Sequence, residues 1–184
     1  RSKLAAAGYG QAKITEASHL VVIARRTDTR ENIVAERIAR TAKIQGVPET
    51  ALDGFKQMLD GTIAGRDDAA LDTWNRSQTY IALGSMMETA SLLNVDNAAM
   101  EGFDPKGVDE VLGLSAKHLT ATSMLALGYR SEKDEAAKRP KVRRSFDEVV
   151  EFTKPGKVER HEFLSHLLRV IEFKGSIAEV TRQT

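Results

Sequence analysis

Two short apolar runs, far apart in the chain, constrain its fold most. The first, Ser18–Arg25 (SHLVVIAR), is rich in β-branched residues between polar flanks, which is typical of a strand buried on both faces. The second is Leu119–Arg130 (LTATSMLALGYR). Between them the apolar residues recur at helical spacing. Strands separated by long helices, with too few strands for a doubly wound sheet, predict an α+β layer architecture.

Three helices are predicted between the two runs, over Thr29–Ile44, Glu49–Ile63 and Asp67–Leu93, because their apolar residues share one helical face. Gly46-Val47-Pro48 separates the first two helices. The middle of the third helix carries the small residues Ala82, Gly84 and Ser85. We therefore expect a close neighbour there, either within the core of the same chain or at a subunit interface.

Composition excludes several classes of protein. The 184 residues contain 27 basic and 26 acidic side chains, so the net charge of +1 does not indicate a nucleic-acid partner. The absence of cysteine excludes disulfides, thiolate metal sites and a cysteine nucleophile. No apolar run approaches the roughly 18 to 20 residues of a membrane span, and the start RSKLAAAGYG lacks a secretory apolar region. We expect a cytoplasmic protein without a membrane partner.

The histidines and glycines do not form a familiar metal or nucleotide motif. His161 and His166 are five residues apart and would lie on different faces of a helix, since each residue turns about 100°. We expect no metal site, and we expect structural roles for His19 and His118. Gly8-Tyr9-Gly10 opens like a dinucleotide fingerprint, but the third glycine would fall at a lysine and a strand follows, so the Rossmann interpretation fails.

The densest charge run is Lys138–Arg144 (KRPKVRR). In an extended segment, residues two apart point the same way, so Lys141 and Arg143 could converge on one phosphate while Val142 faces the protein. A solvated loop and a nonspecific nucleic-acid patch are the alternatives.

Gly102 is a second candidate site residue. A glycine removes the Cβ that would keep a planar ligand from the main chain, so the amides of Glu101 and Gly102 could face ring heteroatoms. A glycine that merely starts a turn before Asp104-Pro105 explains the local sequence equally well.

Four segments, taken together and in order, carry a family resemblance. They are Lys13–Asp28 (KITEASHLVVIARRTD), Trp74–Gly84 (WNRSQTYIALG), Met100–Leu114 (MEGFDPKGVDEVLGL) and Lys138–Val150 (KRPKVRRSFDEVV). This combination resembles the flavin-dependent nitroreductase family, especially its NAD(P)H-dependent, oxygen-insensitive branch. The resemblance covers roughly residues 1–150.

The resemblance implies a nitroreductase-like three-layer sandwich, with a central mixed sheet flanked by helices and a long central helix at the interface of a homodimer. It also implies noncovalent FMN, with NADH or NADPH as electron donor and a nitroaromatic, quinone or similar small molecule as acceptor, in a two-step ping-pong cycle. The flavin would carry the chemistry, so no catalytic side chain is expected.

The resemblance also implies roles for particular residues. Met100, Glu101 and Gly102 match the main chain near flavin N5. Lys13 matches the lysine at the pyrimidine edge, and Gln11 lies close to a position that usually holds an amide. Lys141 and Arg143 match the Lys-x-Arg pair on the FMN phosphate.

The chain departs from the family pattern at both ends. Family members begin with a further segment that carries an Arg-x-Ser/Thr motif and a Pro-Ser-x-x-x-Gln-Pro-Trp-like stretch, and we expect this segment to be lacking. We expect residues 1–153 to form the FMN-binding domain and residues 154–184, with FLSHLLRVIEF, to form a helical extension. The alternative function is a noncatalytic interaction protein on a truncated nitroreductase fold, with that C-terminal helix binding a partner.

Overall fold

A three-stranded sheet organises the first part of the chain. The computed structural model describes residues 1–135 and 137–149, and the chain divides into two units, Arg1–Tyr129 and Arg130–Thr184. The first unit contains β1 (His19–Arg26), β2 (Asp96–Met100) and β3 (Leu119–Gly128) in the order β1-β3-β2. Both pairings are antiparallel, whereas the resemblance implied a mixed sheet. The predicted α+β class is confirmed.

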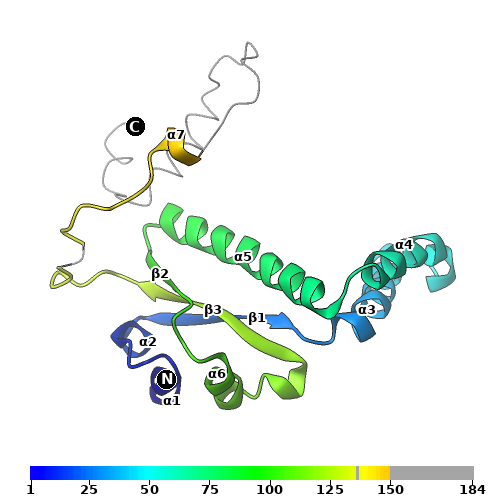
Figure 1. Cartoon of the computed structure of the whole chain (residues 1–184), viewed down its shortest axis with the longest axis horizontal. Coiled ribbons are helices and arrows are strands. Elements are labelled where there is room, and N and C mark those ends of the chain that lie inside the picture. The colour runs from blue at the N-terminus through cyan, green and yellow to red at the C-terminus, as the bar shows by residue number, and fades with distance from the viewer. Residues whose placement is uncertain (136, 150–184) are drawn as a thin grey trace, which may run out of the picture. The chain divides into compact units, whose positions relative to one another are not determined.

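Helices cover both faces of this sheet (Figure 1). The long helix α5 (Asp68–Leu92) lies along one face, and α1 (Ser2–Ala7), α2 (Ala12–Glu16) and α6 (Pro105–Leu112) lie on the other. The main core fills the space between these three short helices and the sheet. Its buried members are Leu4, Ile14, Met100, Phe103, Val108, Leu114, Ala121, Met124 and Ala126. The first unit therefore has the three layers that the resemblance implied.

Two helices beyond one end of the sheet contribute to a second apolar cluster, and Figure 1 shows where these helices lie. These are α3 (Thr29–Gln45) and α4 (Asp53–Ala64), joined through the 3₁₀ turn η1 (Glu49–Leu52). The cluster consists of Val34, Ile38, Ile63 and Leu71, so it also includes the start of α5. Gly46 ends α3 in the left-handed conformation, with φ of 68°, which a glycine adopts without steric cost.

The strands and helices predicted between residues 18 and 130 are present, with two differences in burial. Strand β1 is half-buried from Leu20 to Arg26 rather than buried on both faces, because it is an edge strand of the described sheet. Four apolar residues of the predicted helical pattern are exposed. They are Met58 (58% exposed), Trp74 (37%), Ile81 (65%) and Leu93 (68%).

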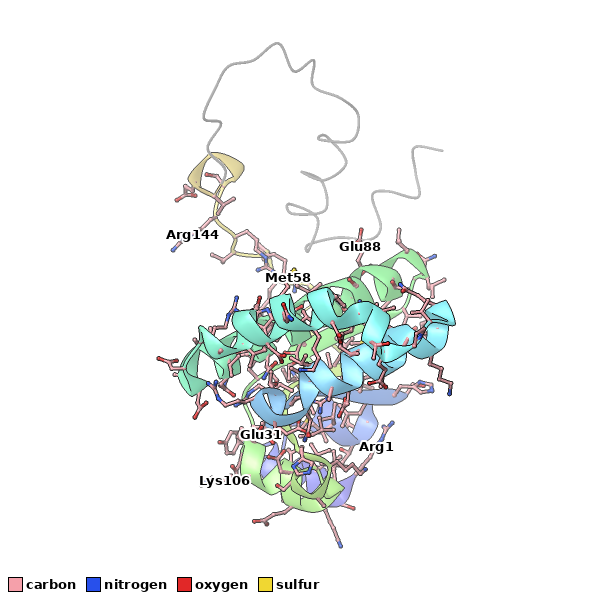
Figure 2. All side chains as sticks on the ribbon, turned by 90° about the vertical axis from the view of Figure 1, so that its right-hand side faces the viewer. Arg1, Glu31, Met58, Glu88, Lys106 and Arg144 are labelled. Atoms are coloured by element: carbon pink, nitrogen blue, oxygen red, sulfur yellow. The ribbon has the colours of Figure 1, made fainter. Side chains whose placement is uncertain are left out.

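The small residues in the middle of α5 do not lie in the core. Ala82, Gly84 and Ser85 are all exposed, and a Cβ added at Gly84 would meet nothing within 4 Å. Burial of this stretch within its own chain is therefore wrong as a prediction, and the subunit interface is the alternative that stays open. Glu88 projects away from the same helix (Figure 2).

The described part of the second unit contains turns and the short helix α7 (Phe146–Val149). The described residues of Ser131–Arg144 form no helix or strand, as predicted for a loop. The predicted domain boundary at residue 153 and the predicted C-terminal helix, with His161 and His166, lie outside the described residues. Within residues 1–135 and 137–149, no helix has the length and apolar character needed to cross a membrane.

Candidate functional site

The turn that follows β2 contains the first group of predicted site residues. Met100 ends the strand opposite Met124 and is 5% exposed, so its side chain belongs to the core and leaves the main chain for any ligand. Glu101 and Gly102 are exposed, and Phe103 returns to the core at 5% exposure. Two exposed residues are thus held between two buried ones.

Three hydrogen bonds fix the shape of this turn. The Phe103 amide donates to the Glu101 carbonyl at 2.9 Å, and the Asp104 amide donates to the carbonyl of Ala7 at 2.8 Å. The side-chain amide of Gln11 donates to the Gly102 carbonyl at 2.7 Å. Gln11 and Gly102 are 91 positions apart in the sequence, so the fold brings together two residues that the resemblance assigned to one site.

The amides of Glu101 and Gly102 remain available as donors. Neither amide donates a hydrogen bond to another residue within the described part of the chain. A Cβ added at Gly102 would meet nothing within 4 Å, and the backbone there does not adopt a positive φ. The open space and the two N–H groups suit the polar edge of a planar ligand.

Lys13 lies two positions beyond Gln11, on α2, and its side chain is exposed. Gln11 itself is half-buried and precedes α2 as its N-cap residue. The hydrogen bond from Gln11 to Gly102 therefore ties the start of the helix that carries Lys13 to the turn that carries the two amides. A cation and two amide donors suit a heterocycle that carries negative charge and hydrogen-bond acceptors.

The second group of predicted site residues, Lys141 and Arg143, belongs to the second unit. Both are exposed, and Arg143 Nη1 donates to the neighbouring Val142 carbonyl at 2.8 Å. Val142 is 90% exposed, so the prediction that it faces the protein is wrong. The segment forms no strand, and without a pleat nothing turns Val142 inward. The convergence of Lys141 and Arg143 on one phosphate stays a prediction.

The sequence did not predict that the turn between α1 and α2 holds the Gln11 side chain in this site. Gly8-Tyr9-Gly10 links α1 to α2, with positive φ at Tyr9 (55°) and Gly10 (70°), and the Gly8 carbonyl also accepts from the Gln11 side chain. A helix and not a strand precedes these glycines, which agrees with the rejection of a dinucleotide fingerprint. The prediction that a strand follows them directly is wrong, because the short helix α2 comes before β1. The signal was the Gly-x-Gly itself, which marks a tight turn as readily as a nucleotide site.

The two histidines that the structure describes, His19 and His118, lie at the surface. No group of three or more metal-ligating side chains occurs within the residues that the structure describes. His19 Nδ1 lies 2.9 Å from Ser18 Oγ, and His118 takes a left-handed conformation, with φ of 54°, at the end of the 3₁₀ turn η2 (Ser115–Lys117). Both histidines are exposed.

Comparisons with known proteins agree on one family, although no family model matches the chain. A relative from Staphylococcus saprophyticus, provisionally named an NAD(P)H nitroreductase, is 36% identical over 163 residues, covering 83% of this chain and 71% of the relative. A provisionally named NAD(P)H nitroreductase from Staphylococcus aureus is 35% identical over 166 residues, covering 84% of this chain and 72% of that protein.

Solved structures share the fold. A provisionally named nitroreductase from Bacillus subtilis aligns with a TM-score of 0.68 and 21% identity, over 82% of this chain and 71% of its own. A provisionally named nitroreductase from Exiguobacterium sibiricum, solved in complex with FMN, aligns with a TM-score of 0.66 and 16% identity, over 82% of this chain and 70% of its own. With the sequence relatives, these alignments assign the chain to the nitroreductase family.

Proposed function

We propose that this chain is an FMN-dependent NAD(P)H oxidoreductase that reduces nitroaromatics, quinones or similar small acceptors in a two-step ping-pong cycle. The names of the staphylococcal relatives support NADH or NADPH as donor, and the FMN complex of the Exiguobacterium protein supports the cofactor. When bound, FMN would supply the redox chemistry by accepting a hydride from the donor and passing electrons to the acceptor.

The observation that carries this proposal is the turn at Glu101-Gly102. Its two amides have no hydrogen-bond acceptor among the described residues, and the space above Gly102 is open. A flavin ring has heteroatoms along one edge and needs main chain at close range, which a residue without a Cβ permits. The residues present therefore fit the cofactor.

Each proposed contact has a separate task. The amides of Glu101 and Gly102, with the main chain of Met100, would orient the ring for hydride transfer. Lys13 would stabilise negative charge at the pyrimidine end of the ring, which favours reduction. Lys141 and Arg143 would bind the phosphate through charge-assisted hydrogen bonds.

The active form in this proposal is a homodimer that associates through α5. One face of the helix carries five residues around Ile81. The other four lie 7, 3, 4 and 11 residues from Ile81, which is close to whole helical turns; they are Trp74, Gly84, Ser85 and Leu92. All five are exposed, with Ile81 at 65% and Leu92 at 77%. Small residues between larger apolar ones let a second helix approach closely. We call these five residues the α5 stripe.

An absorbance spectrum of the purified chain tests the proposed function. We expect a yellow protein, or a colourless one that takes up added FMN, whose flavin absorbance bleaches when NADH or NADPH is added without oxygen. A nitroaromatic or a quinone should then restore the absorbance. A chain that ignores added FMN, or bound FMN that neither nucleotide bleaches, would rule the function out.

A further inference from the structure

The Gln11 side chain is fully used as a donor. Its Nε2 atom donates to the Gly8 carbonyl at 3.0 Å and to the Gly102 carbonyl at 2.7 Å. Because both partners are acceptors, the network fixes which end of the Gln11 amide carries the nitrogen. Both N–H groups are therefore directed at protein carbonyls, so this nitrogen is not free to bind a cofactor.

Two peptide planes connect Gln11 to the amides of the turn. In a trans peptide the carbonyl and the N–H point in opposite directions. Gln11 holds the Gly102 carbonyl, so the N–H of the same peptide, which belongs to Phe103, points the other way and donates to the Glu101 carbonyl at 2.9 Å. With the Glu101 carbonyl held, the N–H of its own peptide, which belongs to Gly102, is directed outward.

We propose that Gln11 is a positioning residue that sets the direction of the Gly102 amide, and through it the donor edge of the cofactor site. This inference rests on the proposed function and goes beyond the assignment of Gln11 as a direct cofactor contact. Gln11 holds the peptide between Gly102 and Phe103 at its carbonyl, and the buried Phe103 side chain holds the same peptide at its other side. This arrangement exists before any ligand binds, so the site is preorganised.

The test uses the full chain and two variants. Gln11→Met keeps the length of the side chain and removes both donors. Gln11→Lys restores a donor of sufficient reach. The matched control is Gln57→Met, because Gln57 is exposed on α4, far from the turn in the sequence. The two measurements are amide hydrogen exchange at Phe103 in the flavin-free protein, and FMN affinity by fluorescence titration.

We expect Gln11→Met to speed exchange of the Phe103 amide about tenfold and to weaken FMN binding about tenfold, which corresponds to the loss of one ordered hydrogen bond. Gln11→Lys should return the exchange rate to within about twofold of the wild type. Gln57→Met should change neither quantity. Thermal unfolding of each variant would show that the chain stays folded.

Two results would overturn the inference alone. One is an unchanged exchange rate at Phe103 in Gln11→Met, which would mean that Gln11 does not order the turn. The other is faster exchange with unchanged FMN affinity, which would mean that binding does not use that order. Failure of the wild-type chain to bind FMN would instead overturn the proposed function, and the exchange data from flavin-free protein separate the two cases.

Discussion

Gly102 has neither of the two features by which a fold usually requires a glycine. Its backbone does not adopt a positive φ, and a Cβ added there would meet nothing within 4 Å. Gly46 differs because its φ of 68° would strain any residue with a side chain. The folded chain therefore tolerates alanine at position 102, and any requirement for glycine comes from a ligand.

Gly102→Ala separates these two requirements. In the flavin-free protein we expect the free energy of unfolding to stay within about 0.5 kcal/mol of the wild type, as for a surface change. FMN affinity should fall about tenfold or more, since the new methyl group occupies the space above the turn. Thermal unfolding and fluorescence titration measure the two quantities.

Gly54→Ala is the control for this substitution. Gly54 lies in α4 and also has open space around it, so alanine should stabilise that helix by up to about 1 kcal/mol without changing FMN affinity. Equal FMN affinity in the wild type and Gly102→Ala would contradict a flavin against this turn.

The sequence could identify Gln11 and Gly102 separately as candidate site residues, but it could not show that they form a hydrogen bond with each other. They were assigned to one site through the resemblance, and their hydrogen bond spans 91 positions. No local pattern encodes a contact at that separation, since it depends on how α1 packs against α6 and α2 packs against α1. Val142 illustrates the opposite limit, because alternation predicts an inward side chain only where a strand forms.

At the scale of elements, the junction between β1 and α3 is held by one arginine. Arg26 donates to both carboxylate oxygens of Asp28 at 2.8 Å and also pairs with Glu36 on α3. Asn32 donates to Asp28 at 2.8 Å, and Asn75 on α5 donates to the Arg26 carbonyl at 3.2 Å. The junction therefore links the end of β1 to α3 and α5.

The charges of this junction shift the pKa values of its members. The hydrogen bonds from Arg26 hold the pKa of the Asp28 carboxyl well below its ordinary value, although burial opposes this. Arg26 also lowers the pKa of Glu36, and the two acids raise the pKa of Arg26. The junction thus stays ionised at neutral pH.

Asp28→Asn should destabilise the chain by about 1 to 3 kcal/mol at pH 7, because the half-buried Arg26 loses the charge of its buried partner. Since folding lowers the pKa of Asp28, its stabilisation is complete above the unfolded value of about 4 and is lost as the pH falls below it. The difference between wild type and variant in urea unfolding should therefore shrink in acid.

Asp60→Asn is the control for the junction. Asp60 forms an exposed pair with Lys56 one turn away, at 2.6 Å, so its loss should cost no more than about 0.5 kcal/mol at any pH. A stability difference for Asp28→Asn that does not depend on pH would contradict the assigned role of its charge.

The length of each helix or strand, and its content of apolar and β-branched residues, determined whether the sequence could predict it. The long helices α3 and α5 and the strands β1 and β3 have enough apolar residues for their periodicity to show. Strand β2 (DNAAM) has five residues and no β-branched side chain, so its strand character comes from pairing with β3. Helices α1 and α2, of six and five residues, are too short for a periodic pattern.

At the scale of the whole molecule, the α5 stripe divides one helix into two environments. Leu71, Leu83 and Ala90 face the core, while Ile81 and Leu92 are 65% and 77% exposed. A helix with apolar residues on both sides has one more face to bury than its own chain covers. In the proposed homodimer, the second copy of α5 buries that face.

Ile81→Glu should disrupt the proposed dimer, because it places a charge at the centre of the α5 stripe, where association would remove water. We expect the dimer dissociation constant to rise at least about tenfold, measured by light scattering across a dilution series. Met58→Glu is the matched control: Met58 is 58% exposed on α4 and is labelled in Figure 2, but lies outside the stripe. The control should leave the assembly unchanged. A monomeric wild type, or equal dissociation constants for wild type and Ile81→Glu, would contradict association through this face, whereas weaker assembly in Ile81→Glu alone would locate the interface on α5.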